Sequence, residues 1–232
     1  MQRLDKFLSE AGAASRKEIK ALVRQGRVTV DGCVAAAPDQ KVDERTAVVC
    51  LDGVTVEGYR TVTILLYKPA GYVTSTDDPR DRTVMELIPE RYRRLGVVPV
   101  GRLDKETEGL LLLTNDGGLN HRLTAPRHGV RKTYYAEHEG TAGADDVAAF
   151  RAGLTLRDGT VCLPAELRPL GEGKSEITVQ EGKYHQVRRM MASRGMTVTY
   201  LRRETEGGLT LAGLSCGEVR ELTEAELAAL EP

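Results

Sequence analysis

The chain has 232 residues, of which 41% are hydrophobic and 29% charged, and its formal net charge is −1. This composition is typical of a globular protein with one or two domains, and it excludes a uniformly basic nucleic-acid binder, although not one with local basic patches. No apolar run reaches the roughly 18 residues of a membrane span. The four cysteines are scattered, which argues against a metal site or a disulfide framework and favours a cytoplasmic chain with reduced thiols.

Two short helices are predicted at the N-terminal end. Apolar residues follow the i, i+3, i+4, i+7 spacing of an amphipathic helix from Leu4 onwards. Ser15 and Glu18 then have the spacing of a capping box, which predicts the start of a second helix. Gly26 should end that helix, and an alternating strand over residues 27–30 leads into an Asp-Gly hairpin turn.

Positive charge is concentrated in this first segment. Residues 1–27 contain seven basic and three acidic side chains, which gives +4, whereas the whole chain carries −1. A solvated helix face is the simpler interpretation, but the order of helix, capped basic helix, glycine, strand and hairpin resembles the S4 domain, a small RNA-binding module, over residues 2–50. The resemblance implies contacts with RNA phosphates. The side chains concerned are Arg16, Lys17, Lys20, Arg24 and Arg27.

A second domain is expected after a linker near residues 53–60. We therefore assign residues 1–58 to the first domain with its linker, and residues 61–232 to the second. The second domain should open with a strand over residues 61–67, which ends at the turn Lys68-Pro69-Ala70-Gly71. Residues 74–82 and 91–94 are polar or arginine-rich, and we expect both to form exposed loops.

A charged loop over residues 101–109 lies between two predicted strands. A short Val- and Pro-containing strand precedes it, and four consecutive leucines follow it, bounded by a glycine and an Asn-Asp-Gly-Gly turn. Such a run is typical of a strand buried on both faces, and loops held by rigid strands often carry functional residues. Asp104 is the carboxylate nearest the first strand. From spacing alone, an ordinary polar turn with a capping aspartate is the simpler interpretation.

Residues 117–136 contain no carboxylate and end in a predicted strand over residues 133–136. The exclusion of acids suggests a phosphate-facing surface, although a basic loop without a partner is the alternative. The cations concerned include Arg127, Arg131 and Lys132. Further on, we expect a helix over residues 145–154, a strand over 177–179, an amphipathic helix with Val187 and Met190 on its buried face, short strands over 198–221, and a terminal helix over 223–230.

The tract GRLDKETEGLLLLTNDG resembles the signature of the RNA pseudouridine synthases, and in particular the branch named for the ribosomal small-subunit enzyme. EGKYHQVRRM, beginning at Glu181, resembles the second diagnostic block of the same family. The resemblance covers nearly the whole chain. It implies an α+β protein, in which a small S4-like domain is followed by a catalytic domain built on a mixed, mainly antiparallel sheet with flanking helices.

The resemblance also implies roles for individual residues. Asp104 would be the essential catalytic residue, Arg188 the cation that pairs with it, and Tyr134 the ring that packs on the target base. Arg102 would fill the space left by the extruded base or contact a phosphate, and Arg189 would contact RNA. A guanidinium beside a buried aspartate favours the ionised form that the chemistry needs. Glu206 is a departure, because the family usually has isoleucine at this position.

The implied reaction converts one uridine of ribosomal RNA, most simply small-subunit RNA or an assembly intermediate of it, to pseudouridine. It needs no redox step, and we expect no cofactor, no membrane association and a monomer. Whether Asp104 attacks C1′, attacks the base or starts an elimination through a glycal stays open. A large-subunit RNA enzyme is the alternative within the family. A non-catalytic RNA-binding or assembly factor is the alternative outside it.

Overall fold

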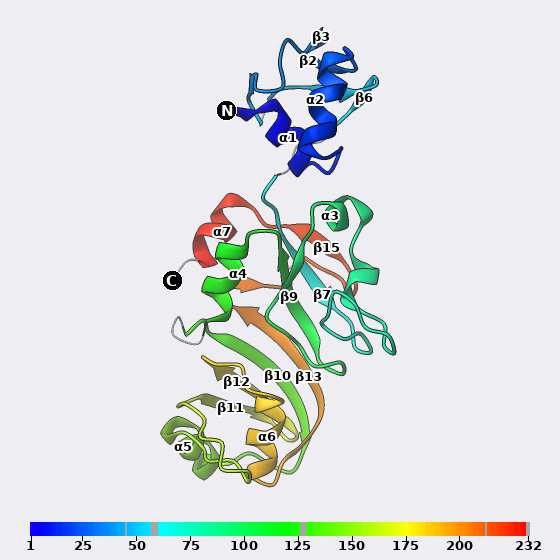
Figure 1. Cartoon of the computed structure of the whole chain (residues 1–232). Helices are drawn as coiled ribbons and strands as arrows, with labels where there is room; N and C mark the ends of the chain where they lie inside the picture. Colours follow the sequence, from blue (N-terminus) through cyan, green and yellow to red (C-terminus); the bar gives the residue numbers. More distant parts are fainter. Residues whose placement is uncertain (45, 57–59, 126–128, 212, 231–232) are drawn as a thin grey trace. The chain divides into compact units, whose positions relative to one another are not determined.

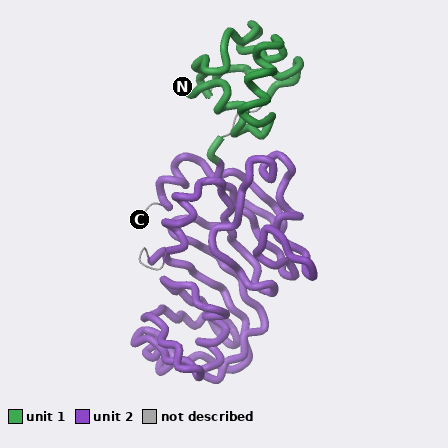
Figure 2. Tube along the Cα trace, in the orientation of Figure 1, with its two compact units in different colours: residues 1–61 green, residues 62–232 purple. Residues whose placement is uncertain are grey.

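The computed structural model describes residues 1–44, 46–56, 60–125, 129–211 and 213–230. The chain divides into two compact units, Met1–Thr61 and Val62–Pro232, which Figure 2 shows in different colours. Among the described residues, no helix is both long enough and apolar enough to pass through a bilayer.

The first unit packs two helices against two small antiparallel sheets. The expected capping box is present, because Glu18 N donates to Ser15 Oγ at 3.4 Å and Ser15 N donates to Glu18 Oε2 at 2.9 Å. Strand β6 lies inside the stretch where we predicted a linker. The helices are α1 (Leu4–Glu10) and α2 (Arg16–Arg24); β1 (Gln2–Arg3) pairs with β4 (Lys41–Val42), and the second sheet has the order β3 (Cys33–Val34), β2 (Val28–Val30), β5 (Val49–Leu51), β6 (Val54–Thr55).

The second unit is built on one nine-stranded sheet. Seven of its strands have the order β11-β12-β10-β13-β9-β7-β15, and the other two, β8 and β14, pair with β9 and β13. Only the β9–β13 pair is parallel among the described strands, so the mixed, mainly antiparallel sheet that we predicted is confirmed. The strands are β7 (Thr63–Lys68), β8 (Val98–Val100), β9 (Glu108–Thr114), β10 (Lys132–Glu139), β11 (Glu166–Gly171), β12 (Lys174–Val179), β13 (Thr197–Glu206), β14 (Leu209–Thr210) and β15 (Val219–Glu221).

Helices flank this sheet in two groups (Figure 1). The 3₁₀ helix η1 (Val84–Leu87) and α3 (Glu90–Arg94) cover one face of β7 and β9, while α4 (Gly117–Thr124) and α7 (Glu224–Leu230) cover the other. At the far end of the sheet, α5 (Ala144–Ala152) and α6 (Gln186–Ser193) pack on β10, β12 and β13. The expected helices over residues 145–154 and 223–230 are therefore present, with boundaries shifted by one or two residues.

The predicted double burial of β9 is confirmed. Its leucines alternate between two clusters, with Leu111 and Leu113 facing η1 and α3 and with Leu110 and Leu112 facing α4 and α7, and all four side chains are fully buried. β8 pairs with β9 antiparallel, so the charged loop between them starts and ends on adjacent strands, of which β9 and Val100 at the end of β8 are buried. This scaffold fixes both ends of residues 101–107.

Three local predictions were wrong. Residues 91–94 belong to helix α3 rather than to an exposed loop, because Tyr92 is buried in the core. Gly117 starts α4 instead of closing a turn, since the Asp116 side chain accepts a hydrogen bond from Leu119 N and caps the helix. Residues 197–206 form the single ten-residue strand β13 where we expected short strands.

Candidate active site

A buried lysine holds the backbone of the loop that carries Asp104. Lys68, the last residue of β7, is fully buried, and its ammonium donates to the carbonyl oxygens of Pro69 at 3.0 Å, Asp104 at 3.2 Å, Lys105 at 3.1 Å and Thr107 at 2.8 Å. Burial lowers the pKa of Lys68 to about 8, and the nearby carboxylates of Glu106 and Asp104 oppose this shift. One cation therefore supplies hydrogen bonds to four carbonyl groups of this turn and loop, and it holds their backbone together.

A second segment clamps the same loop from the side. The hydroxyl of Thr74 donates to Leu103 O at 2.7 Å and accepts from Leu103 N at 3.1 Å. Gly71 N donates to Lys105 O at 2.9 Å, and the Lys105 ammonium lies 2.6 Å from a carboxylate oxygen of Asp81. The backbone on both sides of Asp104 is thus held by hydrogen bonds, which leaves its side chain as the part of the loop free to face a substrate.

A pocket opens beside Asp104, and it draws its walls from both halves of the sheet. Arg102 to Asp104 and Thr107 come from the β8–β9 connection, Tyr134 comes from β10, Leu201 from β13, and most of the remaining wall from the segment that leads into α6. Asp104 keeps about one third of its side chain exposed there. The lining residues are Arg102, Leu103, Asp104, Thr107, Tyr134, Val179, Glu181, Gly182, Lys183, His185, Gln186, Val187 and Leu201.

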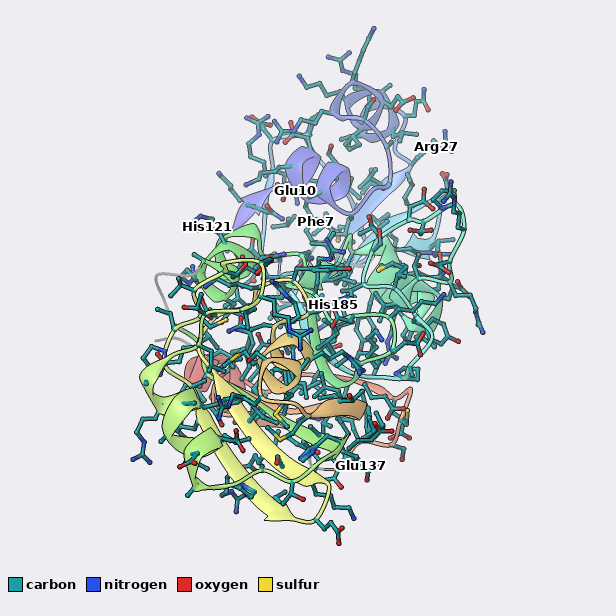
Figure 3. All side chains as sticks on the ribbon, turned by 90° about the horizontal axis from the view of Figure 1, so that it is seen from below. Phe7, Glu10, Arg27, His121, Glu137 and His185 are labelled. Atoms are coloured by element: carbon teal, nitrogen blue, oxygen red, sulfur yellow. The ribbon has the colours of Figure 1, made fainter. Side chains whose placement is uncertain are left out.

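The side chain that approaches the Asp104 carboxylate is not the one we predicted. Asp104 Oδ1 lies 3.5 Å from His185 Nε2, and no ion pair with Arg188 is formed. Arg188 instead donates to Val198 O at 3.0 Å and to Glu106 O at 3.4 Å. The reason is its place in α6: His185 caps the helix at the pocket, while Arg188 lies almost a turn further on, where carbonyl oxygens of β13 and of the loop accept its hydrogen bonds. Figure 3 labels His185 beside this helix.

The predicted base-packing residue, Tyr134, does line the pocket with Asp104. Burial raises the pKa of the Tyr134 hydroxyl, against the effect of the nearby Arg203 cation. Arg203 is itself buried: its Nε donates to Leu110 O at 2.7 Å, and its Nη2 lies 3.1 Å from Glu206 Oε2. Glu206, the residue at which the chain departs from the family pattern, is thus a buried partner of Arg203, and its other oxygen lies 3.7 Å from the ammonium of Lys132.

The predicted RNA-binding cations divide into two groups. Five are exposed and form no ion pair with any residue that the structure describes: Arg16, Lys17, Lys20 and Arg24 on α2, and Arg102 at the pocket. Four already have acidic partners, namely Arg27 with Asp52, Arg131 with Glu166, Lys132 with Glu206, and Arg189 with Asp158. Arg127 lies outside the described residues. The acid-free tract therefore meets acids from elsewhere in the chain, which weakens the prediction of a phosphate-facing surface there.

Two residues of the site escaped the sequence analysis. Lys68 was read only as part of a turn, and His185 was given no role. For Lys68 a signal did exist: a lysine directly follows an apolar strand and precedes Pro and Gly, so its side chain continues the buried strand into a turn. For His185 no such signal exists, because its approach to Asp104 depends on two segments that are 81 positions apart.

Comparisons with known proteins agree with this architecture. Residues 62–193 match the family described as RNA pseudouridylate synthase, and residues 2–48 match the S4 domain. A ribosomal small subunit pseudouridine synthase A of Vibrio cholerae is 40% identical over 98% of this chain and 99% of its own. A ribosomal large subunit pseudouridine synthase B of Bacillus subtilis is 36% identical over 98% of this chain and 94% of its own. A crystal structure of a pseudouridylate synthase superposes with a TM-score of 0.69 at 31% identity, covering 99% of this chain and 100% of that one.

The family match covers more than half of the chain, the relatives match it over nearly its full length, and the fold agrees with that of a solved member. The prediction made from the two signature tracts is thereby confirmed. The chain belongs to the RNA pseudouridine synthases, enzymes that isomerise uridine in RNA, and it carries an S4 domain before the catalytic one.

Proposed function

We propose that this enzyme converts one uridine of small-subunit ribosomal RNA to pseudouridine, with Asp104 as its catalytic residue. The observation that carries the proposal is the rigid presentation of Asp104: the loop backbone is held by Lys68 and Thr74, while the carboxylate borders a pocket that Tyr134 also lines. The similarity to relatives named for the small subunit supports the choice of substrate.

The reaction breaks the N1–C1′ bond of uridine, turns the uracil, and joins its C5 to C1′. It needs a carboxylate beside the ribose and walls that retain the detached base. In this proposal Asp104 acts on the nucleoside and the ring of Tyr134 forms a wall against the uracil. The target must leave its stack to enter, as in other enzymes that modify a base. Arg102, exposed at the pocket, then contacts the phosphate or fills the vacated space.

Arg188 takes a different part from the one we first predicted. Its guanidinium bridges the Glu106 carbonyl of the catalytic loop and the Val198 carbonyl of β13, so we assign it as a positioning residue. His185 is the side chain within ion-pair distance of the Asp104 carboxylate. An imidazole at this distance occupies space beside the carboxylate and limits its orientations before substrate enters.

The first unit supplies affinity in this proposal. The exposed cations of α2 contact phosphates, which gives binding strength without sequence readout. We further propose that the enzyme acts as a monomer in the cytoplasm, on ribosomal RNA or on an assembly intermediate of the small subunit.

Mapping of pseudouridines tests the substrate. Ribosomal RNA from cells with and without this protein should differ at one position of small-subunit RNA. Loss of a mark from large-subunit RNA instead would favour the alternative that the 36% identical large-subunit relative represents. Unchanged marks in both RNAs would contradict an activity on ribosomal RNA.

The second alternative, a non-catalytic RNA-binding or assembly factor, is separated by Asp104→Asn. This substitution keeps the size of the side chain and removes its charge. We expect pseudouridine formation to be abolished while RNA affinity stays within a few fold. Retention of full turnover by this variant would show that another residue performs the chemistry.

A further inference from the structure

Tyr184 is an exposed aromatic residue beside the pocket. Among the described residues, only Met1 is a more exposed large hydrophobic residue, and Tyr184 has a relative exposure of 76%. Its ring stacks on the imidazole of His185, with centroids 3.9 Å apart and planes inclined by 17°. One face of the phenol is therefore covered by His185, and the high exposure of the residue leaves the other face accessible.

The backbone holds this ring pair in an uncommon conformation. His185 has φ 46° and ψ 36°, the left-handed region that residues with a Cβ adopt rarely and that clusters at functional sites. Gln186 and Val187, the next two residues, are buried and anchor the first turn of α6. The surrounding structure thus holds His185 in this conformation, and the result is an imidazole that lies between the Asp104 carboxylate and the Tyr184 ring.

The stacked pair spans the boundary of the pocket. His185 lines the pocket and lies 3.5 Å from Asp104, whereas Tyr184 is not among the described residues that line it. The backbone of this segment is fixed by further hydrogen bonds, since Arg189 Nη1 donates to Tyr184 O at 3.1 Å and the ammonium of Lys183 donates to Val161 O at 2.5 Å. Tyr184 is therefore a ring on a fixed backbone, stacked on His185, just outside the site that would hold the target uracil.

Apolar exposure extends to the neighbouring loop. Val161 and Leu163 are 67% and 50% exposed, and their backbones are bonded to Lys183 and to the carboxylate of Glu181. This exposed apolar surface lies at the rim of an RNA-modifying site, next to cations. Contact with the face of an unstacked nucleobase would remove it from water.

We infer that Tyr184 and His185 form a stacking platform for a nucleobase adjacent to the target uridine. This inference rests on the proposed function, because it places the target base in the pocket beside Asp104 and Tyr134. When one uridine is extruded, its neighbour loses a stacking partner, and the open face of Tyr184 replaces it. Stacking on an aromatic ring depends little on base identity, so the platform contributes affinity and the positioning of the strand rather than sequence selection.

Three substitutions of the full-length chain test the platform with ribosomal RNA from cells that lack this protein. Tyr184→Ala should raise KM about tenfold, the range expected for one base stacked on a ring, while kcat changes little. Tyr184→Phe retains the ring and should behave like the parent chain. Tyr184→Leu retains apolar surface without a π-face and should resemble Tyr184→Ala.

Unchanged KM in Tyr184→Ala would overturn the inference, and so would a fall in kcat with KM unaltered, because either result excludes a contribution to binding. Ultraviolet cross-linking of the same RNA, followed by identification of the linked residues, provides a readout that does not need turnover. If even the parent chain forms no pseudouridine, the proposed function fails, yet a cross-link at Tyr184 would still support the platform. Cross-links elsewhere with none at Tyr184 would overturn it.

Discussion

The buried ammonium of Lys68 donates a hydrogen bond to the backbone carbonyl oxygen of Asp104 at 3.2 Å. The contact is made to the main chain, so Lys68 fixes the position of the loop that carries Asp104 through its backbone rather than through the Asp104 carboxylate. Burial of a cation is costly, and carbonyl oxygens around it offset that cost. A lysine at the end of an otherwise apolar strand is thus explained by the loop that it supports.

Replacement of Lys68 by Met should disorder this loop. The carbonyl oxygens of Asp104, Lys105 and Thr107 would lose their buried donor, so we expect the free energy of unfolding to fall by about 3 kcal/mol and turnover to fall at least about tenfold. Denaturant unfolding and pseudouridine formation measure the two effects. Lys105→Met is the matched control, since its ion pair with Asp81 is exposed and its loss should change stability little. Equal effects of both substitutions would contradict the role of Lys68.

Replacement of Gly109 by Ala should prevent β9 and β13 from pairing. Gly109 has φ +109°, and a Cβ at this position would lie 2.2 Å from Arg203 O and 2.6 Å from Arg203 N. Because both atoms belong to backbone, no side-chain movement relieves the clash, and we expect a loss of more than about 3 kcal/mol. Gly96→Ala is the control for conformation alone: φ is +73°, nothing lies within 4 Å of the added Cβ, and the expected loss is about 1–2 kcal/mol. Thermal unfolding compares them.

Neutralisation of α2 should weaken RNA binding and reduce its dependence on salt. Each lost phosphate contact lowers the slope of log K against log salt concentration by roughly 0.7–0.9, so Lys17→Gln, Lys20→Gln and Arg24→Gln together should reduce it by up to about 2–3. Filter binding with ribosomal RNA at several salt concentrations measures the slope. Arg27→Gln is the control, because Asp52 already pairs with that guanidinium and the change in slope should be smaller. An unaltered slope in the triple variant would place RNA elsewhere on the protein.

Acid should weaken the attachment of the last helix. Glu226 accepts hydrogen bonds from Arg220 at 2.6 and 2.8 Å and from Thr223 N at 2.9 Å, and the bonds from Arg220 lower its pKa from 4.5 to about 2. A carboxyl group with a lowered pKa in the folded state stabilises the fold above pH 4.5, and that stabilisation is lost as the pH falls towards 2.

Glu226→Gln should therefore reduce the free energy of unfolding by about 1–2 kcal/mol at pH 7, and the difference from the parent chain should shrink progressively below pH 4.5. Urea unfolding at a series of pH values measures this. Glu224→Gln, an exposed change in the first turn of the same helix, is the control and should have little effect at any pH. A difference that stays constant down to pH 2 would exclude the carboxylate as its cause.

Local patterns predicted much of this fold because local interactions create it. The Ser15 capping box, the doubly buried leucines of β9 and the amphipathic α6 each depend on neighbours within a few positions. β13 was predicted as fragments because Arg203 and Glu206 are buried charges, and a hydropathy pattern cannot show that a strand buries an arginine against a glutamate three positions away. The neighbour of the Asp104 carboxylate was mispredicted for a related reason: whether His185 or Arg188 approaches this carboxylate depends on how α6 is rotated, which its sequence does not fix.

The insertion of β13 between β10 and β9 has a consequence during synthesis. β13 pairs with β10 on one side and with β9 on the other, so it joins the two parts of the sheet. Its residues begin at position 197, well after Asp104 in the order of synthesis. While β13 is still inside the ribosome, β9 and β10 cannot be joined into one sheet, because both pair with β13. We therefore expect the enzyme to become competent only after β13 has left the ribosome, and products truncated before β13 that retain Asp104 to be inert.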